Sequence, residues 1–457
     1  MALKRQLGLA TAALVIVADM IGTGIFMTTG NVLGMTGSAL VVMALWVVGG
    51  CIAIAGALCY AELATTWPDV GGEYVYLKKA FGFLPAFLTG WVSLVVAFSA
   101  PVATGALLLV QYFNRFLHTV TGSPAETMLL DGLWVQKVMA ILVILFFGIV
   151  HIVGVKRGSY IQNFLTILKI LIMVSLIGFG LLAVDFGNIG RLVAQYPAGD
   201  GSTPGFAAMG LALLVVMFAY SGWNGASYIA GEINNPERNL PRAMLYGTLL
   251  TMCLYLLLNA VFLLGAPGPE IMNKDEVGSI ASGFLFGPGM NAFFTLGIAV
   301  ILLSAVSVQM MVGPRVSYAM AQDRMIFSPL AKLHPKYATP WLAILVQMGL
   351  SMLYVLVGNA MTLVIYMGFA LSVFPVMAVI GMMYMRYKEP DLRRPYRVPL
   401  YPLIPLLYVG LSVIMMIAAL MTWTSTSLFS IGVLIAGIPV YYLWRFFSRK
   451  KLVEIPS

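Results

Sequence analysis

The sequence has little charge and almost no cysteine or histidine. Of its 457 residues 9% are charged and 61% are hydrophobic, with 3 cysteines and 3 histidines. A soluble domain carries roughly 25% charged residues, so this chain cannot cover a water-facing surface of its size. Isolated histidines and cysteines at these positions have neither metal-site nor disulfide spacing. The sequence predicts a membrane protein with no cofactor and no metal.

The sequence contains many long apolar runs. They approach the length of about 20 residues that a helix needs to cross the hydrocarbon. Lipid offers no hydrogen bonds, so each run must satisfy its own backbone as a helix. We therefore predict an all-α, polytopic protein with 12 transmembrane helices in a single domain, residues 1–457. The predicted spans are 8–35, 39–64, 82–113, 134–153, 160–184, 206–231, 243–266, 290–322, 341–358, 361–385, 402–422 and 427–447.

The basic residues predict the orientation. With both termini on one side, only Arg115, Lys137, Arg191 and Lys274 lie on the other side, and Lys169 lies inside a span. All the other lysines and arginines share the side of the termini. The positive-inside rule makes that side the cytoplasm, in a plasma or inner cell membrane. The net charge of +9 is thus a topology signal, and no nucleic-acid partner is expected.

Two predicted helices are interrupted by glycine. Their central segments are Asp19-Met20-Ile21-Gly22-Thr23-Gly24-Ile25 in the first span and Phe218-Ala219-Tyr220-Ser221-Gly222-Trp223-Asn224-Gly225 in the sixth. Glycine inside a helix costs up to about 1 kcal/mol relative to alanine. The glycines either allow close helix packing or mark unwound backbone at a binding site in the middle of the membrane. They do not decide between these by themselves.

The positions of the two interruptions match in the two halves of the chain. Each lies in the first helix of a five-helix set, as in transporters built from inverted repeats. We therefore predict a first repeat over 8–184, a second over 206–385, and two additional helices over 402–447. Side-chain identity between the halves does not contribute to this prediction.

Two such breaks suit a zwitterion. The segment that restarts after Gly22 would present the backbone N–H groups of Thr23, Gly24 and Ile25, at a positive helix end, to a carboxylate. The segment that ends near Phe218 and Ala219 would present carbonyl groups to an ammonium. An amino acid satisfies both ends at once, without a charged side chain in the site.

Further motifs lie between these spans. They are Gly22-Thr23-Gly24-Ile25-Phe26; Pro68-Asp69-Val70-Gly71-Gly72-Glu73-Tyr74-Val75-Tyr76; Phe218 to Asn224; Glu232, Asn235, Pro236, Arg238, Asn239, Leu240, Pro241 and Arg242; and Arg315, Tyr318, Ala319, Met320, Ala321 and Asp323. With five motifs in this order, the chain resembles the amino acid–polyamine–organocation superfamily. Within it, the pattern is most similar to the L-type amino acid transporter-like exchangers. The chain departs from that pattern at Gln322 and Arg324.

The resemblance implies a five-plus-five inverted repeat with helices 1 and 6 unwound, and exchange of amino acids. The expected pocket has no acidic or basic side chain besides Asp19, so we expect neutral L-amino acids, the small or branched kinds first. The resemblance also implies substrate contacts at Ile21, Thr23, Gly24, Ile25, Phe218, Ala219, Ser221 and Asn224. Phe218 is also the candidate aromatic gate. The heteromeric relatives carry a cysteine in the loop after helix 3. Residues 114–134 have none here, so no disulfide-linked heavy subunit is expected.

Two ionisable residues lie within the predicted spans and are candidates for coupling. The resemblance implies that Lys169 fills a sodium position, joining the carbonyls of Ala18 and Ile21 to hydroxyls of helix 8, Ser304 first and Ser307 second. The alternative is that Lys169 reaches the cytoplasmic interface. Asp19 could pair with Lys169, carry a proton or contact substrate, or it could form an ion pair that serves packing alone.

The sequence lacks the signatures of other classes of protein. The sequence has no zinc-protease motif, no nucleophile–histidine arrangement and no nucleotide-binding loop, so an enzyme or an ATP-driven pump is not expected. No filter repeat or ring-forming charged helix indicates a channel. Exchange and proton-coupled symport of amino acids both remain open at this point.

Overall fold

The computed structural model describes residues 3–122, 132–197, 205–274, 276–358, 360–422 and 424–453. Across these ranges the regular structure is helical, and β-pairing is limited to the isolated bridges Leu7–Ile233 and Ser38–Gln195. The prediction of an all-α chain is therefore confirmed for the described residues.

The helices follow one another with short connections. Their bounds are α1 Leu9–Met20, α2 Gly24–Thr36, α3 Ala39–Thr66, α4 Glu73–Phe81, α5 Phe83–Val92, η1 Ser93–Ala97, α6 Ser99–Thr121, α7 Leu133–Ile152, α8 Val155–Ala183, η3 Phe186–Ile189, α9 Gly190–Val193, α10 Phe206–Tyr220, α11 Gly225–Tyr228, η4 Ala230–Glu232, α12 Pro236–Gly265, α13 Gly268–Ile271, α14 Val277–Val312, α15 Pro314–Gln322, η5 Ser328–Ala331, α16 Trp341–Val357, α17 Ala360–Lys388, α18 Leu403–Thr422 and α19 Thr424–Val453.

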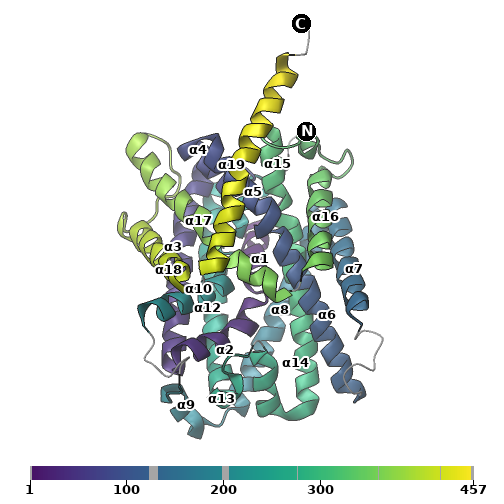
Figure 1. Cartoon of the computed structure of the whole chain (residues 1–457), viewed down its shortest axis with the longest axis vertical. Coiled ribbons are helices and arrows are strands. Elements are labelled where there is room, and N and C mark those ends of the chain that lie inside the picture. Colours follow the sequence, from purple (N-terminus) through teal and green to yellow (C-terminus); the bar gives the residue numbers. More distant parts are fainter. Residues whose placement is uncertain are drawn as a thin grey trace.

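Several of these helices can cross a membrane. In the described part of the chain 7 are long and apolar enough, or 8 if α1 and α2, which meet at a bend of 42°, form one broken span. Shorter apolar helices include α10 and α16. Figure 1 shows α4 and α15 at one end of the molecule, with the outer part of α19, and α2, α9 and α13 at the opposite end.

The two broken helices lie side by side in the centre. α1 packs against α12, α10 packs against α2, and α3 runs along α12. The rings of Trp46, Tyr220 and Tyr255 fill the space between α3, α10 and α12, with centroids 5.2 to 5.5 Å apart. A second group, α6, α7, α14 and α16, packs beside this bundle. The central bundle therefore holds both glycine-containing segments against one another.

The predicted span at 82–113 is not one regular helix. It consists of α5, a turn of π-helix (η1) and α6, which continues to Thr121. The Phe98 N–H donates to Ser93, and the Ser99 hydroxyl donates to the Leu94 carbonyl at 2.6 Å. Pro101 follows directly and has no backbone N–H to donate to the preceding turn. Such π-turns often accompany functional sites, and a periodicity argument cannot detect a single inserted residue.

The eighth predicted span also starts elsewhere. We predicted residues 290–322, whereas α14 begins at Val277 and is kinked at Gly287, where φ is 74°. The apolar helical segment before this glycine, Val277–Gly287, lies outside the predicted span. α15 follows α14 directly and runs over Pro314–Gln322.

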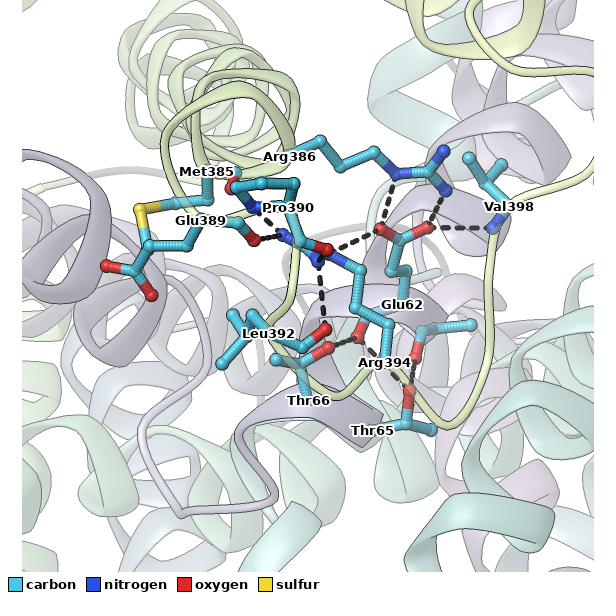
Figure 2. A network of polar contacts seen from close by, with 11 residues as sticks. Glu62, Thr65, Thr66, Met385, Arg386, Glu389, Pro390, Leu392, Arg394 and Val398 are labelled. Atoms are coloured by element: carbon cyan, nitrogen blue, oxygen red, sulfur yellow. Dashed lines mark hydrogen bonds and ion pairs between the residues drawn. The ribbon is translucent and has the colours of Figure 1, made fainter.

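Buried ion pairs join the helix ends on the side of α4 and α15. Glu62, at the end of α3, accepts from Arg386 of α17 and from the Val398 N–H, and Arg394 lies 3.6 Å away (Figure 2). On the same side Arg315 of α15 pairs with Glu232 of η4 at 2.8 Å, both fully buried. Removing one partner of such a pair leaves an uncompensated buried charge, which costs about 3–5 kcal/mol.

Candidate functional site

The first break leaves backbone donors free. α1 ends at Met20, Ile21 is extended with φ −78° and ψ 91°, and α2 begins only at Gly24. Among the described residues, none accepts a hydrogen bond from the N–H groups of Thr23, Gly24 or Ile25. These groups stand at the N-terminal end of the 13-residue helix α2, where the helix dipole favours an anion.

The second break is made by Gly222. α10 ends at Tyr220, Gly222 has φ 101°, and the short helix α11 begins at Gly225. Only glycine adopts that φ without strain. The carbonyls expected to face an ammonium already accept hydrogen bonds: that of Phe218 from the Ser221 N–H and hydroxyl, and that of Ala219 from the Tyr255 hydroxyl at 3.0 Å. The Phe218 carbonyl thus has both lone pairs engaged, whereas the Ala219 carbonyl can accept one bond more.

The two breaks contact each other through their glycines. A Cβ atom on Gly24 would lie 2.6 Å from the Ala219 Cα, and one on Gly222 would lie 2.7 Å from the Asp19 carbonyl carbon. Gly22 has open space, with the Ala305 Cβ as its nearest contact at 4.0 Å. The structure therefore shows close packing at Gly24 and Gly222 and unwound backbone at both breaks, while a binding role for that backbone stays a prediction.

A cavity of about 160 Å³ lies between the breaks. It is walled by α1, α2, the π-turn, α10 and the second break, with contributions from α14, α17 and α18. The candidate residues that line it are Asp19, Thr23, Gly24, Phe218, Ala219, Ser221 and Asn224. The candidates Ile21, Ile25, Lys169, Ser304 and Ser307 are buried but do not line it.

Asp19 reaches the cavity from the last turn of α1. Its carboxylate accepts a hydrogen bond from the Gln309 side chain of α14 at 2.5 Å and lies against Gly222 and Gly225. Among the described residues it forms no ion pair within 4.0 Å, with Lys169 or with any other cation. Asp19 therefore connects the first break to the second break and to α14.

Lys169 lies behind the first break. Its ammonium is fully buried and donates to the carbonyls of Ala18 at 3.0 Å and Ile21 at 2.5 Å, at the negative end of α1. The expected serine contacts differ. Ser304 accepts from Gln162 at 3.1 Å, and Ser307 bonds to His151 at 3.0 Å. The two hydroxyls already have partners on α8 and α7, which sequence spacing could not reveal.

Glu73 also lines the cavity, and the sequence did not mark it as a site residue. It is the first residue of α4, directly after Gly71 and Gly72, both at positive φ. α4 falls between the predicted spans 39–64 and 82–113, where the sequence predicts no membrane helix. Burial raises the pKa of the Glu73 carboxyl above its ordinary value, while its hydrogen-bond donors oppose that rise. The one available signal was an acidic residue directly after two glycines.

Comparison with known proteins shows the family. The amino acid permease family model matches residues 7–439. The serine/threonine exchanger SteT of Bacillus subtilis (strain 168) is 32% identical, over 96% of this chain and 97% of its own length. The large neutral amino acids transporter small subunit 2 of Homo sapiens is 30% identical over 98% of this chain and 82% of its own length. The b(0,+)-type amino acid transporter 1 of Mus musculus is 29% identical over 98% of this chain and 89% of its own length.

The chain belongs to the amino acid permease family. It is therefore a multi-pass membrane transporter and not an enzyme, and the resemblance to L-type exchangers inferred from its motifs is confirmed.

The two glycines of the first break predict separable effects. Gly24→Ala should lower both substrate binding and thermal stability, because its Cβ would meet the backbone of Ala219. Gly22→Ala should leave stability close to wild type and weaken binding alone, since its Cβ has room but narrows the cavity. Heat unfolding of the purified protein in detergent, with and without amino acid, measures both quantities. Equal stability of the two variants would contradict the close contact at Gly24.

Proposed function

We propose that this chain exchanges neutral L-amino acids across the cell membrane by alternating access. The observation that carries the proposal is the set of free N–H groups of Thr23, Gly24 and Ile25. Thr23 and Gly24 line a cavity that the second broken helix also lines. An α-carboxylate satisfies these donors. The α-ammonium can use the remaining lone pair of the Ala219 carbonyl across the same cavity, and can reach the Phe218 carbonyl in place of the Ser221 hydroxyl.

The cavity wall favours a side chain without charge. Its two carboxyl groups are engaged, that of Asp19 by Gln309 and that of Glu73 by neutral donors. Much of the remaining wall is apolar and includes Met20, Phe98, Leu214, Met217 and Phe218. A cavity of about 160 Å³ also limits the length of the side chain. We therefore infer that small or branched neutral amino acids are preferred, with Phe218 closing over them and Ser221 and Asn224 beside them.

Counterflow in liposomes tests this proposal. Vesicles that contain the purified chain and an excess of an unlabelled neutral amino acid should accumulate a labelled one well above the level of vesicles loaded with buffer. Amino acid amides should compete poorly, because they lack the anion that the free N–H groups accept.

The same assay separates the alternatives. A channel would show no stimulation by internal substrate. A proton symporter would accumulate substrate in response to an inward proton gradient without internal amino acid. If the amides competed as well as the free amino acids, the carboxylate would not be needed for recognition.

We also propose the arrangement of 12 spans with an inverted repeat over 8–184 and 206–385, followed by the two helices of 402–447. The packing supports it, because helices at equivalent positions of the two halves contact each other. α3 packs on α12, α6 on α14 and α7 on α16, and the first broken helix contacts the second. Elements close to a two-fold axis make such contacts with their counterparts.

We propose that both termini are cytoplasmic. In a chain whose native Cys51, Cys59 and Cys253 are replaced, a cysteine in place of Lys156 or Lys388 should react with a membrane-impermeant reagent only after the membrane is opened. A cysteine in place of Lys274 should react in intact cells. All three side chains are exposed, so access depends on the side of the membrane alone. The opposite labelling would reverse the orientation.

Lys169 supplies a fixed cation at the first break. In sodium-coupled transporters of this kind of architecture, half-helix carbonyls coordinate the ion. Here the Lys169 ammonium contacts the carbonyls of Ala18 and Ile21 instead. We propose that Lys169 replaces a sodium ion and couples the break to the direction in which the empty carrier faces. Asp19, close by on α1, provides compensating negative charge.

Lys169→Ala should reduce exchange strongly and shift the apparent affinity on one face of the membrane more than on the other, because it frees both carbonyls at the break. Asp19→Asn in the Lys169→Ala background should add little, which gives a large coupling energy in a double-mutant cycle. Lys137→Ala, on α7, is the matched control. Additive losses would show that Asp19 and Lys169 act independently.

We propose that the chain works without a disulfide-linked partner subunit. The loop over 114–134 contains no cysteine, and Cys51, Cys59 and Cys253 all lie within helices α3 and α12. A cysteine within a membrane helix is poorly placed for a bond to an extracellular domain.

A further inference from the structure

Glu73 occupies an unusual place for a carboxyl group. It begins α4, yet its side chain is 5% exposed and lines the substrate cavity. The turn before it is tight, since a Cβ on Gly72 would lie 2.6 Å from the ring of Tyr228. Glu73 therefore stands at the point where α4 meets the second broken helix.

The partners of Glu73 are all uncharged. Its Oε1 accepts hydrogen bonds from the Tyr60 hydroxyl at 2.9 Å and the Asn224 amide at 2.7 Å. Its Oε2 lies 3.4 Å from the Thr89 hydroxyl, and the Tyr228 hydroxyl is a further hydrogen-bond partner of the carboxyl. The carboxyl thus joins α3, α5, α11 and the second break.

The other buried glutamates are treated differently. Among the described residues Glu62 is paired with Arg386 and Arg394, and Glu232 is paired with Arg315, whereas Glu73 has no cation within 4.0 Å. A buried carboxylate without a cation is costly, and a proton removes the cost. The chain therefore neutralises two buried glutamates with arginine and leaves the third, at the substrate cavity, without such a partner.

The hydrogen bonds fit the protonated acid. The two shortest hydrogen bonds, from Tyr60 and Asn224, are both accepted by Oε1. In a protonated carboxyl group this oxygen would be the carbonyl oxygen, which accepts hydrogen bonds in the same way. The remaining oxygen, Oε2, faces a hydroxyl that can accept as well as donate. A proton on Oε2 would then donate to Thr89 without disturbing the bonds to Tyr60 and Asn224.

The surrounding charged and titratable groups do not supply a cation. Those that face this region are Tyr60 on α3, Tyr76 on α4, Tyr228 on α11, Tyr408 on α18 and, across the cavity, Asp19 on α1. Lys78 on α4 is bound to Asp323, and Arg315 on α15, which packs against α4, is bound to Glu232. Phenols ordinarily titrate near pH 10, so a proton near neutral pH would be taken up by the carboxyl.

We propose that Glu73 is a proton-binding site in the wall of the substrate cavity. A proton from the water that reaches the cavity adds to Oε2 while Glu73 joins α4 to the second break, and it returns to water when these elements separate. Separation removes the Tyr60 and Asn224 donors and admits solvent, in which the charged form is favoured. This site is separate from Asp19, and the inference rests on the proposed function only in taking this cavity as the substrate cavity.

The sign of the pH effect follows. Closing the cavity requires that Glu73 first take up a proton, and this becomes costlier as pH rises above the pKa that Glu73 has in the open, solvated state. Wild-type exchange should therefore fall by up to about tenfold per pH unit above that pKa. Glu73→Gln keeps an oxygen for Tyr60 and Asn224 and places an amide opposite Thr89. It should therefore sustain exchange that no longer responds to pH.

Counterflow of the full chain in liposomes, with the same pH on both sides, measures this response over a series of pH values. Asp69→Asn is the matched control, because Asp69 is exposed in the same turn region, and it should keep the wild-type profile. Glu73→Asp should restore a pH response with a shifted midpoint. In weakly buffered detergent solution, addition of the transported amino acid should change proton binding by about one proton in wild type and by none in Glu73→Gln.

The outcomes are distinct. A wild-type pH profile in Glu73→Gln, or loss of the profile in Asp19→Asn alone, would overturn the assignment. A Glu73→Gln protein that folds and binds substrate but shows no exchange at any pH would also overturn the assignment, because exchange would then require the ionised carboxylate. If wild type itself shows no counterflow with any amino acid, the proposed function fails, whereas proton binding by Glu73 is still measured by pH titration of wild type against Glu73→Gln.

Discussion

The structure depends on how the unpaired backbone of the two breaks is satisfied without water. The protein supplies donors to the carbonyls: Lys169 donates to those of Ala18 and Ile21, and the one hydroxyl proton of Tyr255 is shared between those of Met20 and Ala219, at 2.6 and 3.0 Å. The N–H groups that open α2 are left without acceptors among the described residues. An unsatisfied donor in the membrane interior costs several kcal/mol, so this imbalance favours an anion, and the carboxylate of a substrate can fill that place.

The same constraint accounts for the glycines. Tyr255 can bond to both breaks only if they approach closely, and they do so at Gly24 against Ala219 and at Gly222 against Asp19. A side chain at either glycine would separate the breaks and leave carbonyls unpaired. If the breaks bind substrate as proposed, close packing and substrate recognition are one requirement in this chain, although the sequence presents them as alternatives.

The sequence predicted the features whose signals are local. The apolar runs predicted helices, and Gly22-Thr23-Gly24 and Gly222 predicted where α1 and α10 end. The π-turn before Pro101, the partners of Ser304 and Ser307, and the place of Glu73 were missed or wrong. Each of these depends on tertiary contacts: α4 folds back onto the cavity, and Gln162 and His151 reach the serines from other helices. Hydrophobic periodicity reports which face of a helix is apolar, and not which polar group of another helix lies opposite.

Asn224 shows how the substrate cavity connects to the α4 side. It lies in the second break, lines the cavity, and donates from one amide nitrogen to both Glu73 at 2.7 Å and Tyr228 at 3.2 Å. In the proposed mechanism, a substrate that draws this amide toward itself weakens the bond to Glu73. Because that bond favours the ionised carboxylate, its loss favours protonation. We therefore expect substrate and proton to be coupled through a single hydrogen bond between the cavity and α4. Because such coupling is reciprocal, a proton on Glu73 would in turn raise the affinity for substrate.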